Sequence, residues 1–540
     1  MKGLMMDYQL TLQTILRRAE RLHGSKEIVS RLPDKSFRRM TYADFVGRAK
    51  RLAVGLGGLG LRPGDRIATL SWNSHEHLEA YFGVPAFGGV VHTLNPRLHP
   101  DELAFIATHA GDRAIVVDET LLPVLERFRE QAPFEHVVVI SRVDGAPAGA
   151  IAYEELLASA DLGAYVELDP HEDDAAAMCY TSGTTGRPKG VVYSHRALVL
   201  HSLVVAAAEA FGITERDVVL PVVPMFHVNA WGFPFVATLV GAKQVFPGPH
   251  LDAVSLLDAL ALERVTITAG VPTIWLGILQ ALDAAPGAYD LASLRAMVIG
   301  GSAAPQAMIE GFQERHGLTV VHAWGMTEMT PIGTLGHLTE ELEQQPAESR
   351  YAYRSKQGRP VPLVEVRARG AAGLVPWDGK TMGELEVRGP CIAREYYESP
   401  ESADRFTDDG WFRTGDIVTI DPRGYVEITD RTKDLIKSGG EWISSVALEN
   451  ALMGHPAVAE AAVIAVPDPK WQERPLAVVV LLEGRSATEA ELLVHLAERF
   501  PKWWLPEAVE LVAEIPKTAA GKFKKSALRE RYAERAASAP

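Results

Sequence analysis

Residues 180–190, YTSGTTGRPKG, gather hydroxyl side chains and glycines around one lysine. The hydroxyls belong to Thr181, Ser182, Thr184 and Thr185, the glycines are Gly183, Gly186 and Gly190, and the lysine is Lys189. Glycine lets backbone N–H groups converge on an anion without a Cβ in the way, and such a nest binds anions. With a lysine charge beside it, this composition predicts a loop that binds a polyphosphate.

Two other interpretations of this run are less favoured. The P-loop pattern, started at Gly183, requires glycine at position 188, where the chain has Pro188. A Ser/Thr/Gly-rich run is also typical of a solvated linker. Apolar residues flank the run on both sides, at 175–180 and 191–193, where a linker has no reason to be. A buried binding loop is therefore the favoured interpretation.

The run resembles the signature of the adenylate-forming superfamily, which includes acyl-CoA synthetases, luciferases and the adenylation domains of peptide synthetases. Further motifs follow in the family's order, and the resemblance extends over about residues 40 to 525. It implies that the loop residues hold the phosphates of ATP. These residues are Thr181, Ser182, Gly183, Thr184, Thr185, Gly186 and Lys189.

Residues 322–328, HAWGMTE, resemble the family's second nucleotide motif. The resemblance implies that His322, Ala323 and Gly325 border the nucleotide and that Trp324 packs on its adenine. It also implies that Thr327 donates a hydrogen bond to the α-phosphate and that Glu328 binds Mg²⁺ near Thr181. Mg²⁺ prefers one or two carboxylates with phosphate oxygens, so a lone glutamate suffices. Trp324 stands where tyrosine is common, so stacking is kept and the hydroxyl contact is lost. Alternatively, Trp324 is an ordinary core residue.

Residues 411–416, WFRTGD, end in an aspartate that matches the family's ribose-binding motif. A carboxylate with two acceptor oxygens suits a vicinal diol, so Asp416 is expected to bind the ribose hydroxyls. Arg431, 15 residues later, is the expected second ribose or phosphate contact. Either residue alone is equally consistent with an ordinary surface charge.

The C-terminal fifth of the chain resembles the family's moving domain. The resemblance places the hinge at Lys433 and a nucleotide- and CoA-facing stretch at 437–443, KSGGEWI, which includes Lys437, Gly439, Gly440 and Trp442. In 515–523, IPKTAAGKF, it implies that Lys522 is catalytic. A mobile lysine charge can neutralise the α-phosphate and carboxylate oxygens as they react. The alternative, a solvated basic tail, suits the lysines that follow.

Residues 224–231, PMFHVNAW, resemble the acid-binding segment of fatty acyl-CoA synthetases. The resemblance implies that His227 and Val228 lie near the substrate carboxylate and that Trp231 is a gate to an apolar tunnel. A second wall is expected from 300–305, with Gly301, Ser302 and Ala303. A lone histidine near aromatic residues is more often a satisfied core residue, which remains the alternative for His227.

Bulk properties limit the class of protein. A chain of 540 residues is expected to hold several domains or subdomains, and its net charge of −15 argues against binding nucleic acid or an anionic membrane. Two cysteines, Cys179 and Cys391, suit a reducing compartment rather than a disulfide scaffold. No signal-peptide pattern and no run of about 18 apolar residues occurs, so we expect a cytoplasmic protein without a membrane span.

Strand patterns at 66–71, 90–93, 113–118, 136–140 and 265–268 alternate with helix patterns such as 75–87 and one that begins at Thr41, whose spacing from Asp44 predicts a capping box. Repeated βα units predict a parallel sheet layered with helices. Short strands and turns follow from residue 383, and a smaller region with strands and helices follows from 431. The expected fold is α/β: a large N-terminal domain, 1–430, of layered βα subdomains plus a β-rich part, and a small mobile α+β C-terminal domain, 431–540, with the hinge at its start.

Together these motifs predict an AMP-forming acyl-CoA synthetase with ATP, Mg²⁺ and CoA as cofactor and cosubstrates. A medium- or long-chain fatty acid is the expected substrate, and the alternative is a short acid such as methylmercaptopropionate. A carrier-loading adenylation protein and a luciferase-like oxygenase are the alternatives from other classes. We also expect a homodimer, by the same resemblance.

Overall fold

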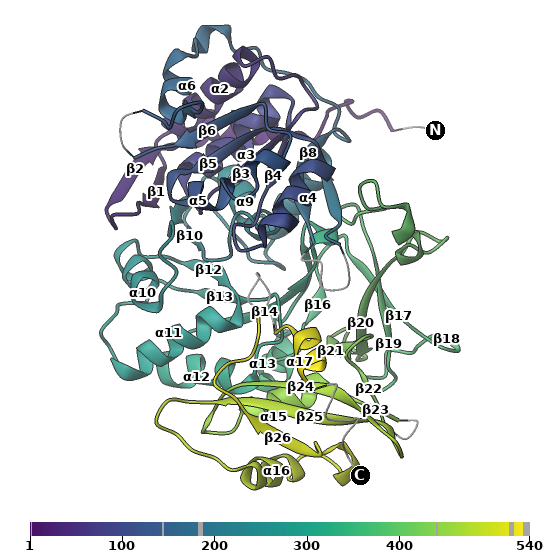
Figure 1. The fold of residues 1–540 in the computed structure, drawn as a ribbon. Helices are drawn as coiled ribbons and strands as arrows, with labels where there is room; N and C mark the ends of the chain where they lie inside the picture. Colours follow the sequence, from purple (N-terminus) through teal and green to yellow (C-terminus); the bar gives the residue numbers. More distant parts are fainter. Residues whose placement is uncertain (2, 143–144, 182–186, 439–440, 518–522, 533–540) are drawn as a thin grey trace.

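The computed structural model describes residues 1, 3–142, 145–181, 187–438, 441–517 and 523–532. Within these residues the strands form four sheets, and helices cover the faces of the two largest (Figure 1). Nothing is described for Ser182, Gly183, Thr184, Thr185, Gly186, Gly439, Gly440 and Lys522, so the expectations for these residues lie outside the described part of the chain.

The N-terminal sheet is the predicted parallel βα layer. Its strands run in the order β7 (Ile151–Ala152), β6 (His136–Ile140), β5 (Asp112–Asp118), β3 (Arg66–Leu70), β4 (Val90–Thr93), β8 (Ala175–Tyr180) and β9 (Gly190–Ser194). All neighbours are parallel except β8 and β9, whose antiparallel register pairs Tyr180 with Gly190. The phosphate-loop run therefore connects two paired strands. The expected helix at 75–87 is confirmed as α3 (His75–Phe87).

The second large sheet supplies the strand that carries the second nucleotide motif. Its order is β16 (Arg359–Pro360), β15 (Ile332–Leu335), β14 (Val320–Gly325), β13 (Ala296–Ile299), β12 (Ile267–Gly270), β10 (Val218–Pro221), β11 (Lys243–Phe246), β1 (Glu27–Arg31) and β2 (Phe37–Thr41). Helices α10 (Ala253–Leu262), α11 (Pro272–Ala284) and α12 (Gln306–His316) accompany it. The strand expected at 265–268 begins instead at Ile267, because Val265 still closes the end of α10 with an N–H bond to Leu260.

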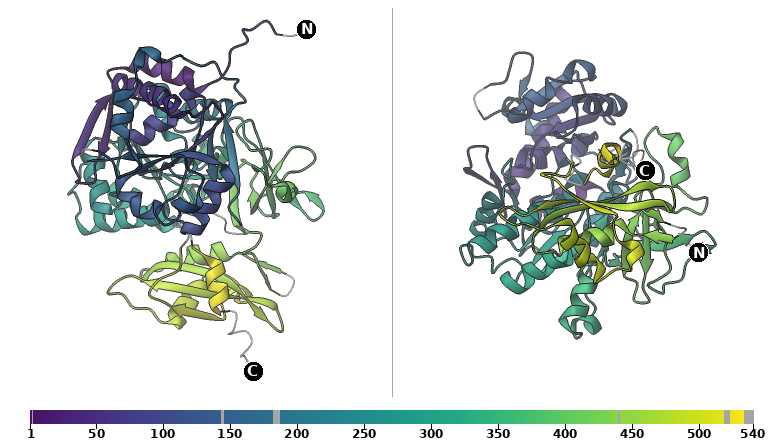
Figure 2. Two further views of the ribbon diagram at one scale, coloured as in Figure 1. Left: turned by 45° about the horizontal axis from the view of Figure 1, so that its top comes forward. Right: turned by 60° about the horizontal axis from the view of Figure 1, so that its bottom comes forward.

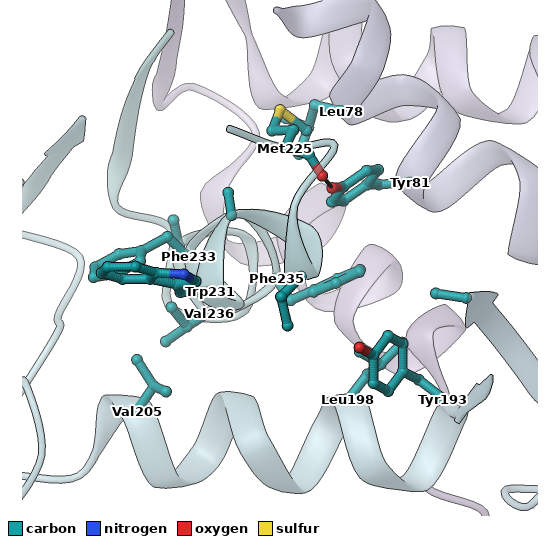
Figure 3. Close-up of a cluster of buried hydrophobic side chains, with 14 of the residues drawn as sticks. Leu78, Tyr81, Tyr193, Leu198, Val205, Met225, Trp231, Phe233, Phe235 and Val236 are labelled. Atoms are coloured by element: carbon teal, nitrogen blue, oxygen red, sulfur yellow. Dashed lines mark hydrogen bonds between the residues drawn. The ribbon is translucent and has the colours of Figure 1, made fainter. Parts of the chain in front are cut away.

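A buried layer of helices joins the two large sheets. It contains α1 (Leu12–His23), α2 (Tyr42–Gly58), α7 (His195–Ala206) and α9 (Phe233–Val240), which pack on one another. Thr41 begins α2 with the capping box that its spacing from Asp44 predicts. In Figure 3 the aromatic side chains of α9 point into this layer, where the Phe235 ring stacks on Tyr81 with centroids 5.3 Å apart.

The remaining two sheets are smaller. The order β18 (Gly373–Leu374), β17 (Glu365–Gly370), β19 (Gly383–Arg388), β20 (Phe412–Ile420) and β21 (Val426–Arg431) forms the β-rich part, and every neighbour in it is antiparallel. The last sheet contains β23 (Glu441–Ile443), β22 (Ile436–Ser438), β25 (Gln472–Leu481), β24 (Val458–Asp468) and β26 (Ala508–Leu511). With α15 (Ser445–Met453), α16 (Glu489–Ala497) and α17 (Lys525–Tyr532), it forms the yellow-green end of the molecule in Figure 1.

This C-terminal part lies at the end of the molecule away from the N-terminal helices, as the left view of Figure 2 shows. It follows directly from β21, which ends at Arg431. The domain boundary expected at 430/431 stays a prediction. Within the described residues, no helix is both long enough and apolar enough to cross a membrane.

Burial of His201 predicts a specific pH dependence of stability. Its side chain on α7 is 3% exposed, and burial lowers its pKa from 6.5 to about 3. The unfolded chain binds a proton at pH 4–6 that the folded chain does not, so acid favours unfolding there. We expect the His201→Leu variant to lose less of its thermal stability between pH 7 and pH 5 than the wild type, by up to about 1.4 kcal/mol per pH unit. Melting curves at both pH values test this, and identical slopes would contradict it.

Candidate active site

Two adjoining pockets lie where the ends of β8 and β14 and residues 414–416 of β20 meet the start of the C-terminal part. The first brings together predicted residues from five separate segments: Thr181, Lys189, His227, Val228, Trp231, Gly301, Ala323, Trp324, Gly325, Thr327, Glu328, Arg431 and Lys433. The second shares several of these and adds Ser302, Ala303, His322 and Asp416. Among the described predicted residues, only Lys437 and Trp442 line neither pocket. They lie on the β22–β23 hairpin, where the Lys437 ammonium is 4.7 Å from the Trp442 ring centroid.

The part of the first pocket predicted to hold the phosphates is formed by the β8–β9 connection. The Lys189 backbone N–H donates to the Thr181 hydroxyl at 3.1 Å, and Thr181 N–H donates back to the Lys189 carbonyl at 2.9 Å. The Lys189 ammonium lies 5.0 Å from the centroid of the Tyr396 ring, a cation–π contact that holds it beside the pocket. Arg187 and Arg405 also line this pocket, so positive charge is concentrated at this end.

Glu328 is held by a residue that no sequence motif indicated. Its side chain is 5% exposed, and its Oε1 accepts a hydrogen bond from the Tyr396 hydroxyl at 2.5 Å. Burial raises the pKa of Tyr396, with the Glu328 charge adding to the shift, so the hydroxyl stays protonated and donates. Tyr396 lies in the connection between β19 and β20, outside any of the motifs, which is why its role could not be predicted.

The oxygen donors of this pocket fit the expected Mg²⁺ ion. Glu328 and the Thr181 hydroxyl line the same cavity, and no cluster of three or more His, Cys, Asp or Glu side chains suited to a metal occurs among the described residues. A closed protein cage is not needed, because Mg²⁺ keeps waters and takes substrate phosphate oxygens beside one or two carboxylates. The assignment of the ion to these residues stays a prediction.

The residues predicted to hold the nucleoside lie around the carboxylate of Asp416, which is 1% exposed. Trp324 Nε1 donates to Asp416 Oδ2 at 3.0 Å, and Arg431 Nε lies 2.6 Å from Asp416 Oδ1. Trp324 is 7% exposed yet lines both pockets, so it is at once a core residue and a pocket wall. Each carboxylate oxygen keeps a free lone pair, which leaves acceptor capacity for a diol.

A strained turn forms another part of the lining of the first pocket. Val228, Asn229, Ala230 and Trp231 form α8 (Val228–Trp231) with φ values of 45°, 52°, 50° and 55°. This is one turn of left-handed helix, which costs roughly 1–2 kcal/mol for each residue with a Cβ. The Trp231 ring packs against Gly300, where a Cβ would lie 2.9 Å from the ring. The turn thus presents His227, Val228 and Trp231 to the pocket at a fixed angle.

The C-terminal part closes both pockets from the other side. Lys433 lines the first, and burial lowers its pKa. Phe523, which bridges to Lys517, lines both pockets. Val446, Glu449 and Met453 of α15 complete the second pocket. Phe523 is thus the part of the C-terminal motif that the structure places at both pockets.

Two family models match this chain. Residues 16–397 match "AMP-binding enzyme", and residues 447–522 match "AMP-binding enzyme C-terminal domain". The chain belongs to the AMP-binding enzyme family. The resemblance stated from the motifs is thereby confirmed.

Curated relatives of this AMP-binding enzyme extend over nearly its full length. It is 52% identical to a long-chain-fatty-acid–CoA ligase of Thermus thermophilus, over 98% of this chain and 96% of that protein. It is 42% identical to a medium-chain-fatty-acid–CoA ligase of Ectopseudomonas oleovorans and 44% to a 3-methylmercaptopropionyl-CoA ligase of Ruegeria pomeroyi, each over 98% of this chain and 98–99% of the relative. The predicted enzyme class, an acyl-CoA ligase, is confirmed.

Solved structures confirm the expected fold. An anthranilate CoA ligase in complex with anthranoyl-AMP superposes with a TM-score of 0.87 at 27% identity, covering 99% of this chain and 100% of that one. A Mycobacterium tuberculosis fatty acyl CoA synthetase has a TM-score of 0.72 at 30% identity, covering 98% and 99%. The large N-terminal part and the small C-terminal part both belong to the matched fold.

The bond between Trp324 and Asp416 predicts a selective effect on nucleotide binding. Trp324→Phe keeps an aromatic face but removes the N–H donor, so the carboxylate loses one of the contacts that orient it. We expect the KM for ATP to rise about five-fold, the scale of one hydrogen bond, while kcat at saturating ATP changes less. The readout is AMP release at varied ATP and saturating acid.

Trp275→Phe is the matched control for this variant. Trp275 is fully buried and, like Trp324, donates its indole N–H, here to the Val298 carbonyl at 3.1 Å, but it lines neither pocket. We expect this control to lower thermal stability without changing the KM for ATP. Equal changes of KM in both variants would mean that Trp324 has no particular part in nucleotide binding.

Proposed function

We propose that this AMP-binding enzyme is an AMP-forming acyl-CoA synthetase that activates a medium- or long-chain fatty acid. The observation that carries the proposal is one pocket lined both by Lys189 and Glu328 and by His227 and Trp231. A cationic, oxygen-donating end suits a triphosphate, and the end with histidine and tryptophan suits a carboxylate with an apolar tail. The α-phosphate and the carboxylate then meet between them, beside Thr327.

The reaction proceeds in two balanced steps. A carboxylate oxygen attacks the α-phosphorus, the bond from phosphorus to pyrophosphate breaks, and an acyl-adenylate forms. The CoA sulfur then attacks the acyl carbon, the mixed anhydride breaks, and AMP leaves. In this scheme Lys189 and Thr327 hold phosphate oxygens, His227 orients the acid, and Lys522 neutralises the charge that develops in the first step. Mg²⁺ bound at Glu328 and Thr181 would offset the charge of the phosphates.

The names of two relatives and the apolar packing behind Trp231 support a fatty acid as the substrate. The matched ligases of Thermus thermophilus and Ectopseudomonas oleovorans are named for long- and medium-chain fatty acids. Behind Trp231 the molecule is apolar, with Phe233, Phe235 and Val236 of α9 facing a buried cluster (Figure 3). An alkyl chain entering this region exchanges water for apolar contact, worth about 0.8 kcal/mol per CH₂.

A short sulfur acid is the second candidate substrate. The 3-methylmercaptopropionyl-CoA ligase match at 44% identity supports it. So does the closed end of the pocket, because the Trp231 ring is only 7% exposed and packs against Gly300. If this ring stays in place, the pocket ends after a few carbon atoms.

The substrate test is AMP release with ATP, Mg²⁺ and CoA across straight-chain acids from butyrate to palmitate, with methylmercaptopropionate beside them. We expect the highest kcat/KM at six carbons or more, because the tail then displaces Trp231 and reaches the apolar cluster. A maximum of kcat/KM at methylmercaptopropionate would mean that the short acid, and not a fatty acid, is the preferred substrate. No AMP with any acid would contradict the function itself.

The role of Lys522 gives a second test of the mechanism. Lys522→Ala should slow acyl-AMP formation at least about 10²–10³-fold, the scale of one oxyanion stabiliser, and spare thioester formation from supplied acyl-AMP. Lys524→Ala is the control, because Lys524 is exposed and lines neither pocket. A Lys522→Ala enzyme that makes acyl-AMP at the normal rate would remove this residue from the mechanism.

We further propose a cytoplasmic homodimer. The support is the family resemblance and the two free cysteines, Cys179 and Cys391. Sedimentation equilibrium of the full chain tests the oligomeric state, with twice the 58.8 kDa chain mass expected.

A further inference from the structure

The left-handed turn that presents His227 and Trp231 is joined to the core by a buried amide that the proposed chemistry does not use. Asn229 is 3% exposed and has φ 52° and ψ 44°. Asparagine is one of the few residues with a Cβ that adopts this conformation readily, because its short polar side chain can form local hydrogen bonds. Its neighbours in the turn are Val228, Ala230 and Trp231, which have no such preference.

The side chain of Asn229 connects the turn to the strand that leads into the phosphate loop. Its Oδ1 accepts a hydrogen bond from the Cys179 thiol, with 3.4 Å between sulfur and oxygen. Cys179 lies in β8, two residues before Thr181. Burial raises the pKa of Cys179 to about 11, so the sulfur keeps the proton that it donates.

Thr93, at the end of β4, contacts both the Cys179 thiol and the segment that precedes the turn. Its hydroxyl lies 3.3 Å from the Cys179 sulfur and donates to the carbonyl of Phe226, the residue before His227, at 3.3 Å. The segment just before the turn, at Phe226, and the second residue of the turn, Asn229, are therefore joined to neighbouring strands of the N-terminal sheet. Because the four left-handed residues are strained, contacts from outside the turn must keep them in place.

We propose that Asn229 is a positioning residue for the acid substrate: through Cys179 it fixes the turn that carries His227 and Trp231 against the strand that begins the phosphate loop. This inference rests on the proposed function, since it takes the turn as the acid-binding end of the pocket. It assigns to Asn229 and Cys179 a joint role, so that the acid is held at a set distance from the phosphates.

Variants separate the backbone preference of Asn229 from its side-chain contact. Asn229→Gly keeps a residue that adopts the left-handed conformation but removes the amide, whereas Asn229→Ala removes both. Cys179→Ala removes the donor, and Cys179→Ser replaces it by a hydroxyl. Cys391→Ala is the matched cysteine control, because its thiol donates to the Ala197 carbonyl and lines neither pocket of the candidate active site.

The measurement is AMP release by the full chain, with the acid and ATP varied separately and the most active acid of the series as probe. We expect Asn229→Gly and Cys179→Ala each to raise the KM for the acid about five-fold, the scale of one hydrogen bond, with the KM for ATP changed less than about two-fold. Asn229→Ala should raise the KM for the acid further. The Cys179→Ser and Cys391→Ala variants should keep a KM for the acid near that of the wild type. The double variant Asn229→Gly/Cys179→Ala should be no worse than the more affected single variant, because both remove one interaction.

Three results would overturn the inference: lowered melting temperatures with no change in the KM for the acid, an equal rise in the KM for ATP, or single effects that multiply in the double variant. A wild type that releases no AMP with any acid would instead overturn the proposed function. In that case calorimetric titration of octanoate decides the inference, with weaker binding to Asn229→Gly than to the wild type as the expected result and equal binding as the contradicting one.

Discussion

A single buried carboxylate, that of Asp416, joins three strands from two sheets at the candidate active site. It lies on β20 of the β-rich sheet, accepts from Trp324 on β14 of the second large sheet, and pairs with Arg431 at the end of β21. A charge 1% exposed is costly unless it is hydrogen-bonded and paired, so this arrangement constrains all three strands together. Because the C-terminal part begins directly after Arg431, the same ion pair lies at the start of that part.

The pocket follows from this constraint. Strand ends from both large sheets line the two pockets, and we propose that the phosphates bind at the β8–β9 connection and the acid at the left-handed turn of α8. The buried hydrogen bond between Cys179 and Asn229 fixes the position of the turn relative to the strand β8. The site is thus held by a few buried polar groups at the points where sheets meet. Strained backbone occurs where a side chain must face the reactants, as is common at functional sites.

The sequence predicted the layered fold and most pocket residues, because strand patterns, glycines and short motifs are local signals. Thr327 and Glu328 lie at the pocket as their motif indicates. What could not be predicted depends on contacts between distant segments: the Tyr396 bond to Glu328 spans 68 residues, and the Trp324 bond to Asp416 spans 92. The periodicity of apolar residues in the sequence does not indicate which distant residues are paired. The start of β12 was also misplaced by two residues, because a helix end and a strand start look alike in a short apolar run.

The most direct test of the account is the exchange of labelled pyrophosphate into ATP by the purified full chain, with Mg²⁺ present and CoA absent. One pocket that holds the triphosphate and the acid together predicts exchange that depends on an added fatty acid and on no thiol, because acyl-AMP forms reversibly before CoA takes part. Exchange without any acid, or no exchange until CoA is added, would contradict the central claim that carboxylate and α-phosphate meet between Lys189 and Trp231.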